Sequence, residues 1–234
     1  MSLRPLVATG TAAWAGIGII CGMAAEATAL GVWTDSPDIR IAITGARPEE
    51  AEASAKRLLA EGATSLVSWG IAGGLDPDLA PGDLVHGEAV STPDRARWPL
   101  AMPEGGLRRV VLLGSEAVVT TPDLKAALRI DTGAAAVDME THRVATVAAR
   151  AGVPCYAVRA IADPWDRALP SLAANALGPD GRPRIAKVIM GLAGRPWELP
   201  RLLAAKRDSD RALAALSAAA DATFSRLLAV QPPS

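Results

Sequence analysis

Short apolar runs rich in β-branched residues alternate with segments of helical periodicity along most of this chain. The runs include "GIGIICG", "TSLVSW", "RRVVLLG" and "CYAVRAIA", and helical patterns lie between them at residues 48–61, at about 122–130 and in a segment that ends at Gly152. Parallel strands need a long crossover, usually a helix, to connect them. The alternation therefore predicts an α/β fold, a three-layer α/β/α sandwich around a mostly parallel sheet.

The segment that begins at Pro48 has the clearest helix signals. Proline suits the first helical position, acidic residues follow it, Lys56 and Arg57 come later, and Gly62 predicts the end of the helix.

Two further patterns describe the rest of the chain. The glycines of "GIAGG", residues 70–74, predict a turn directly after a strand. About the last fifty residues have helical patterns. We therefore expect one domain over residues 1–234, with a helical C-terminal region at 183–230.

Composition argues against a nucleic-acid partner. Lys and Arg number 24 against 25 Asp and Glu, so the net charge of -1 creates no field that would attract a polyanion. Aromatic residues make up only 3%, too few for a surface on which bases stack. Half of the 234 residues are apolar, enough for a sizeable core.

The cysteines and histidines give no sign of a metal site or a disulfide. Cys21 and Cys155 each lie alone in an apolar run, which favours buried thiols in a reducing compartment. His86 and His142 are the only histidines, so no metal is expected.

The N-terminus imitates a signal peptide. Arg4 precedes an apolar run, but Thr9, Gly10 and Thr11 interrupt it, so a cytoplasmic location is favoured over secretion.

Charged residues stand where predicted strands end. Asp138, Met139 and Glu140 follow a short apolar run, and the run "CYAVRAIA" contains Arg159 and leads to Asp163. In an open α/β sheet, ligands bind in the crevice beyond the carboxyl ends of the strands, so these side chains are candidates for chemistry. The alternative is structural: Glu140 opens a helix, and Asp163 begins a turn before Pro164.

Four pieces in a fixed order give a family resemblance. "GIICGMAAE", "GIAGGL" followed by "GD", "DME" and "RAIAD" resemble the purine and uridine phosphorylase superfamily, in particular its methylthioadenosine/S-adenosylhomocysteine nucleosidase branch. Longer stretches such as "GAAAVDMETH" look like the hopanoid-associated phosphorylases, thought to remove adenine from adenosylhopane. The resemblance implies a nucleoside phosphorylase-like fold with a mixed sheet, and cleavage of an adenine nucleoside that carries a lipophilic 5′ group.

The resemblance also implies residue roles. Asp163 would be the acid that protonates or hydrogen-bonds adenine N7, and Glu140 would accept hydrogen bonds from the ribose hydroxyls above Met139. Gly73 and Gly74 would let the backbone approach the substrate.

Arg159 matches a family position close to the acid, with a salt-bridged strand residue as the alternative. Two positions depart from the nucleosidase pattern: Val118 falls where an aromatic side chain would stack on the base, and Ala162 replaces a serine beside the acid.

The attacking nucleophile is open between water and phosphate. Glu26 matches a general base that activates water, and its charge would repel phosphate. Arg47, at a strand-to-helix junction, and Gly22 would instead bind phosphate as a co-substrate. The subgroup's name slightly favours phosphorolysis, and no cofactor is expected. A hydrolytic nucleosidase for adenosylhopane or soluble thioadenosines, or a nucleoside-binding module without turnover, are the alternatives.

Residues 182–211 form a basic segment. It holds eight Lys or Arg against three acids, interleaved with Trp197, Leu199, Leu202 and Leu203. This pattern suits peripheral contact with the inner face of a membrane, and equally a helix that packs on its own core. A homo-oligomer is expected.

Overall fold

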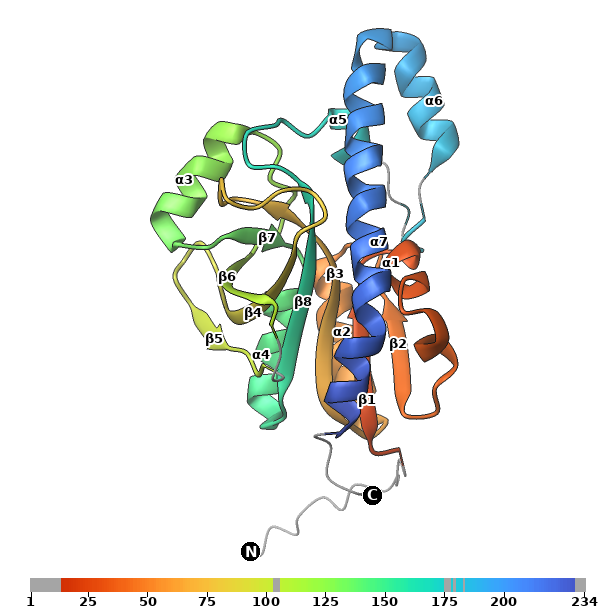
Figure 1. Cartoon of the computed structure of the whole chain (residues 1–234), viewed down its shortest axis with the longest axis vertical. Coiled ribbons are helices and arrows are strands. Elements are labelled where there is room, and N and C mark those ends of the chain that lie inside the picture. Colours follow the sequence, from red (N-terminus) through yellow and green to blue (C-terminus); the bar gives the residue numbers. More distant parts are fainter. Residues whose placement is uncertain (1–13, 103–105, 175–177, 179, 183, 230–234) are drawn as a thin grey trace, which may run out of the picture.

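A computed structural model describes residues 14–102, 106–174, 178, 180–182 and 184–229. The apolar run after Arg4, which imitates a signal peptide, lies mostly outside these residues. Within them the chain forms one eight-stranded mixed sheet (Figure 1). The strands are β1 (Gly16–Cys21), β2 (Ile39–Ile43), β3 (Ala63–Gly74), β4 (Leu84–Ser91), β5 (Arg97–Pro99), β6 (Arg108–Gly114), β7 (Ala136–Asp138) and β8 (Cys155–Asp163).

The sheet is open at one side and closes on itself at the other. β1 pairs in parallel with β2 and β3, and β3 pairs in parallel with β8. β8 then pairs with β4, β4 with β6, β6 with β7, and β7 returns antiparallel to β3. Strands β3, β8, β4, β6 and β7 therefore form a closed ring, which brings the ends of β7 and β8 to the same strand.

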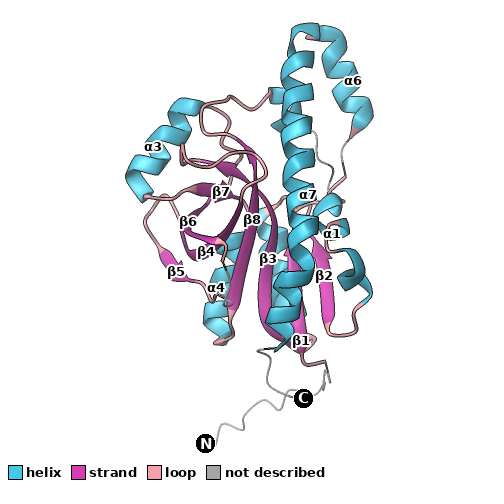
Figure 2. Ribbon diagram, in the orientation of Figure 1, coloured by secondary structure: helices cyan, strands magenta, loops and turns pink. Residues whose placement is uncertain are grey.

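Helices cover both faces of the sheet (Figure 2). On one face α2 (Pro48–Ala60) and α4 (Thr141–Ala151) pack on each other and on the central strands. On the other face α7 (Leu199–Ala229) packs on β8 and β3. The predicted three-layer α/β/α sandwich with a mixed, mostly parallel sheet is confirmed.

Alternating strand residues divide the core between the two faces. Ile20 and Leu66 belong to the cluster under α2 and α4, whereas Ile19 and Trp69 belong to the cluster that contains Phe224 of α7. This period of two is the geometric consequence of a pleated strand buried on both sides.

Helix ends follow the predicted signals. Pro48 is the first residue of α2, as predicted. α3 (Pro122–Thr132) begins after Thr121, whose hydroxyl accepts a hydrogen bond from the Leu124 amide, and ends at Gly133 with φ 68°. Gly152 ends α4 with φ 70°, the left-handed conformation that glycine adopts without strain.

The predicted turn at residues 70–74 is wrong. β3 continues through Gly74, and Gly73 and Gly74 pair with β7. Glycine breaks strands in isolation, but here the pairing with β7 and β8 holds the backbone extended.

The remaining helical elements are α1 (Ala24–Thr28), α5 (Ser171–Ala174), α6 (Ile185–Gly194) and the 3-10 helices η1 (Gly31–Asp35) and η2 (Pro196–Glu198). The buried side chains of α7 begin at Asp208, so its first turns project past the sheet beside α6 (Figure 1).

Candidate active site

Glu26 is a buried carboxyl group just beyond the end of β1. Its Oε2 accepts a hydrogen bond from the Met23 amide at 2.8 Å, and its Oε1 accepts one from the Ile71 amide at 2.8 Å. Burial raises the pKa of Glu26, against the opposing effect of these amides. A Cβ atom on Gly70 would lie 2.5 Å from Oε1 of Glu26, so only glycine in β3 leaves room for this acid.

Glu140 meets Glu26 across the backbone of Gly22. A Cβ atom at Gly22 would lie 2.7 Å from Oε1 of Glu140 and 3.4 Å from Oε2 of Glu26. Gly22 was predicted to bind phosphate, which stays a prediction; the groups beside it in the structure are two carboxyl groups. The strand ends thus bring the two acids together.

Arg159 lies beneath these acids and is fully engaged with protein groups. Its Nε donates to Oδ2 of Asp138 at 3.1 Å, and its second terminal nitrogen donates to Ser68 and Thr141. The same nitrogen is 3.8 Å from Oε2 of Glu140. With 1% of its side chain exposed, Arg159 has the contacts of a salt-bridged strand residue that positions acids; direct substrate contact by Arg159 stays a prediction.

The single guanidinium cannot neutralise every neighbouring acid. Burial would raise the pKa of Asp138, but Arg159 and the hydrogen bonds from Thr141 hold it below its ordinary value. Burial and the adjacent Asp138 carboxylate raise the pKa of Glu140 to about 8. Burial and this neighbouring charge therefore both favour the protonated form of Glu140.

Asp163, at the end of β8, is paired with a lysine that the sequence analysis did not single out. Nζ of Lys125 lies 2.5 Å from Oδ2 of Asp163, and the Lys125 side chain is fully buried. Burial raises the pKa of Asp163, and the hydrogen bond and charge of Lys125 oppose this effect. One signal could have revealed Lys125: a cation in the first turn of a helix opposes the helix dipole and calls for a partner.

The glycines of β3 lie beside this acid. A Cβ atom on Gly73 would be 3.6 Å from Oδ2 of Asp163, and one on Gly74 would be 3.2 Å from the Asp163 carbonyl oxygen. Both predicted positions therefore adjoin the acid, from within a strand.

Other predicted residues lie at the margin. Met139 is partly buried between Asp138 and Glu140. Val118 is 41% exposed in the loop between β6 and α3.

Arg47 lies apart from the acids. It precedes α2, is half exposed, and forms an ion pair with Glu50 at 3.3 Å. The neighbouring Ala46 amide donates to the Gly22 carbonyl at 2.9 Å, so the backbone of this loop, but not the guanidinium, is fixed at the site.

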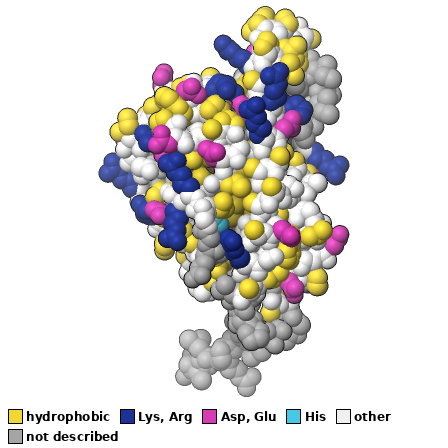
Figure 3. All heavy atoms as spheres, viewed as in Figure 1, with side chains coloured by type: hydrophobic (Ala, Val, Ile, Leu, Met, Phe, Trp, Pro, Cys, Tyr) yellow, Lys and Arg dark blue, Asp and Glu magenta, His cyan; other side chains and the backbone are white. Residues whose placement is uncertain are grey.

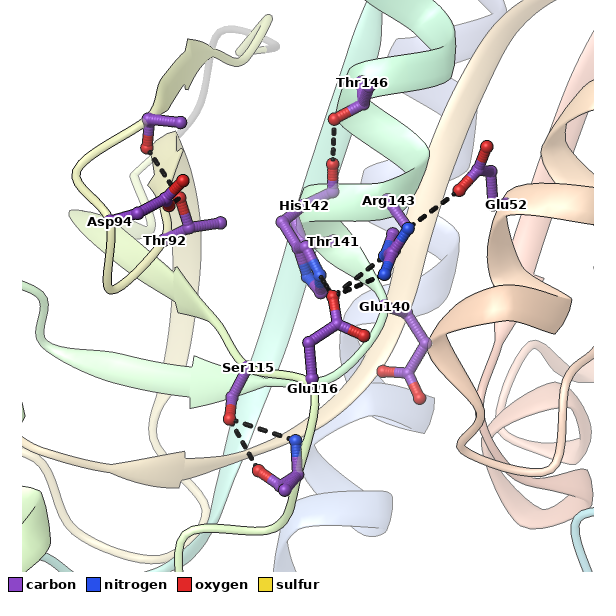
Figure 4. A network of polar contacts seen from close by, with 12 residues as sticks. Glu52, Thr92, Asp94, Ser115, Glu116, Glu140, Thr141, His142, Arg143 and Thr146 are labelled. Carbon is purple, nitrogen blue, oxygen red and sulfur yellow. Dashed lines mark hydrogen bonds and ion pairs between the residues drawn. The ribbon is translucent and has the colours of Figure 1, made fainter.

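A cluster of charged groups anchors the Val118 loop. Oε1 of Glu116 accepts from Nε of Arg143 at 2.9 Å and lies 2.7 Å from Nε2 of His142, while Arg143 also donates to Glu52. Figure 4 shows this cluster at the start of α4, with Glu140 beside it. The cluster borders an open cavity of about 720 Å³ lined by residues including Thr92, Trp98, Ser115, Glu116, His142, Arg143 and Arg150. None of the predicted site residues lines this cavity.

Comparison with known proteins concerns the family and the fold. The model of the phosphorylase superfamily matches residues 28–129 and 104–189. A search of curated proteins found no significant match.

Solved structures share the fold at low sequence identity. The 5'-methylthioadenosine/S-adenosylhomocysteine nucleosidase of Helicobacter pylori superposes with a TM-score of 0.68 at 17% identity, covering 91% of this chain and 98% of that one. Futalosine hydrolase of the same organism gives 0.68 at 17% identity, with 92% and 99% covered. The Campylobacter jejuni nucleosidase gives 0.56 at 19%, with 86% and 98% covered. The family match spans well over half of the residues, and the chain belongs to the phosphorylase superfamily.

Proposed function

We propose that this protein cleaves the N-glycosidic bond of an adenine nucleoside. The observation that carries the proposal is the placement of three buried or nearly buried acids along the C-terminal part of β3: Glu26, which meets Glu140 at Gly22, lies against Gly70, and Asp163 lies beside Gly73. Breaking this bond places positive charge on the ribose and negative charge on the base. A site for it needs an acid at the base and acceptors at the sugar.

Each acid suits one of these roles. Burial favours the protonated form of Asp163, as an acid that donates to adenine N7 requires. Glu140 would accept hydrogen bonds from the ribose hydroxyls and would lose its proton when they bind, because they replace missing solvation. Met139 would form an apolar wall beside the sugar, and Val118 would replace an aromatic wall at the base.

Water is the nucleophile that the geometry favours. Glu26 is held rigidly by two amides, and a carboxyl group so placed can take a proton from water. Phosphorolysis remains a second candidate, because Arg47 stands at the N-terminus of α2 next to the loop bonded to Gly22. Phosphate would have to compete with Glu50 for Arg47 and tolerate the charge of Glu26.

The substrate we propose carries a lipophilic 5′ group, as in adenosylhopane, on the strength of the sequence resemblance. A projecting tip, defined as residues 190–207 of α6, η2 and α7, supports this choice. Met190 and Trp197 of the tip are 71% and 70% exposed. Of the nearby acids, Glu198 pairs with Arg195, and Asp208 pairs with Arg167 and Arg211. Apolar and basic side chains gather at this end (Figure 3), which suits peripheral contact with an anionic membrane.

Adenine release tests the proposal. Adenosylhopane and methylthioadenosine are incubated with the protein with and without phosphate, and the sugar product is identified by mass. We expect Asp163→Asn to lower the rate about 10²- to 10⁴-fold, since an amide cannot donate the proton. Asp166→Asn is the control: it makes the same change at an exposed position in the loop that follows Asp163, and it should keep full activity.

The outcomes separate the candidates. Turnover without phosphate that is lost in Glu26→Gln supports hydrolysis, whereas strict phosphate dependence weakened in Arg47→Ala supports phosphorolysis. Full activity in Asp163→Asn would contradict the assignment of the acid.

A further inference from the structure

Lys125 is enclosed by the protein and bound by three oxygen atoms. Its Nζ donates to Oδ2 of Asp163 at 2.5 Å, to the Pro164 carbonyl at 2.6 Å and to the Arg167 carbonyl at 3.3 Å. An ammonium group has three N–H donors, so each has an acceptor. The side chain reaches this point from α3; Asp163 is the last residue of β8, and the other two acceptors belong to the loop that follows it.

Burial of such a group has a large free-energy cost unless it is paired. An uncompensated buried charge typically destabilises a protein by several kcal/mol. The two backbone carbonyls link α3 to the loop after β8. As neutral dipoles, however, they do not cancel the charge of the ammonium group. Among the described residues, Asp163 is the acid that pairs with Lys125, so the carboxylate that is left when this acid gives up its proton has a cation opposite it.

The other charged groups around Asp163 do not replace Lys125. Arg167 also lowers the pKa of Asp163, but its guanidinium is bound to Asp208, which acts in the opposite direction. Among the residues that the structure describes, Oδ1 of Asp163 has no hydrogen-bond partner, while Oδ2 is held by Lys125. The carboxyl group is thus oriented with one oxygen fixed.

We propose that Lys125 is the positioning residue of the acid: it fixes Oδ2 of Asp163, leaves Oδ1 for the base, and stabilises the carboxylate that forms when the acid gives up its proton. This inference rests on the proposed function. In the step, the proton on Oδ1 moves to adenine N7, and the electron pair of the C1′–N9 bond moves to the base. Asp163 is left as a carboxylate opposite the Lys125 ammonium, and the nucleophile bonds to C1′; where the nucleophile is water, its proton passes to Glu26.

The pair makes a pH-dependent prediction. Activity requires protonated Asp163, so it falls as pH rises through the pKa of that group. An opposite charge at this distance typically lowers the pKa of a carboxyl group by about 1–3 units. Lys125→Gln keeps N–H donors for the carbonyls but removes the charge. We expect it to move the alkaline limb of kcat/KM to higher pH by about 1–3 units, and to lower kcat on the plateau by on the order of tenfold or more.

Two controls separate positioning from folding. Lys56→Gln removes an exposed lysine that pairs with Glu52, and should leave both the limb and kcat unchanged. Lys125→Met removes charge and donors together, and its alkaline limb should move as in Lys125→Gln even if the protein is less stable to denaturant. An unchanged limb in both Lys125 variants, with Asp163→Asn inactive, would overturn the inference and leave the proposed function standing.

Direct titration of the Asp163 carboxyl group tests the inference without any substrate. The Asp163 carboxyl carbon is followed by NMR in labelled protein, with Asp163→Asn giving the assignment. A pKa that rises in Lys125→Gln supports the inference, and an unchanged pKa overturns it whatever the protein cleaves. Full activity in Asp163→Asn would overturn both proposals, because Lys125 would then have no acid to position.

Discussion

At the scale of single residues, the site is built around a shortage of positive charge. Arg159 faces Asp138 directly and lies 3.8 Å from Glu140, and Glu26 is close enough to raise the pKa of Glu140 further. Since one guanidinium serves several acids, it does not offset the effects of burial and of the neighbouring carboxylates, which raise the pKa of Glu140 to about 8.

Glu140 should make stability depend on pH. Its folded pKa of about 8 lies above the ordinary 4.5, so its stabilising contribution is complete below pH 4.5 and is lost as pH rises toward 8. In the wild type this loss should lower the free energy of unfolding by on the order of a few kcal/mol as pH rises. Glu140→Gln should abolish this decrease. Denaturant unfolding of both proteins at pH 5 and pH 8 measures it.

An exposed acid is the control for this measurement. Glu49→Gln, on the surface of α2, should keep the wild-type difference between the two pH values. If Glu140→Gln also keeps that difference, Glu140 is already ionised in the folded protein.

At the scale of elements, α3 delivers Lys125 to Asp163. The helix starts at a fixed point because the Thr121 hydroxyl accepts a hydrogen bond from the Leu124 amide, and Pro122 suits the first turn. Lys125 follows one turn later, so the cap sets where the ammonium group lies.

Loss of this cap should weaken the helix start. Thr121→Ala should lower the free energy of unfolding by about 1 kcal/mol, while Thr121→Ser, which keeps the hydroxyl, should be close to wild type. Denaturant unfolding compares the three proteins. Equal stability of Thr121→Ala and wild type would show that the cap contributes nothing.

At the scale of the whole molecule, the C-terminal helix has two different halves. Pro196–Ala229 is long and apolar enough to cross a membrane by length and composition, but 33% of its most apolar window is buried inside the protein. From Asp208 onward one face packs in the core, with Leu216 and Phe224 fully buried. That half is a core helix, whereas Trp197, Leu199 and Leu203 of the tip are exposed.

The tip should bind anionic vesicles. Flotation with phosphatidylglycerol vesicles at low salt should carry the protein upward, and phosphatidylcholine vesicles or high salt should not, because charge attraction is screened. Trp197→Ser should lose binding, whereas Trp165→Ser, at an exposed position of another loop, should retain it. Absence of co-migration at low salt would refute the membrane contact.

Other predictions at this scale remain untested. They are the single domain over residues 1–234, the homo-oligomer, the cytoplasmic location, and the absence of a metal, a cofactor or a nucleic-acid partner.

The sequence by itself determined the order of elements. Period-two and helical patterns, Pro48 and Gly152 are local signals, and they act through the backbone within a few residues. The positions of Glu26, Glu140 and Asp163 at strand ends could be read from the same patterns, because a strand end is also a local property.

Only the tertiary structure decided which of these groups meet. The turn at 70–74 became strand because β7 and β8 pair with it, a contact between residues more than sixty apart in sequence. Lys125 became the partner of Asp163 because the chain after β8 passes under α3, and Arg47 stayed with Glu50 because its loop faces outward. Charge pairing and burial depend on distances across the fold, and no local pattern encodes those distances.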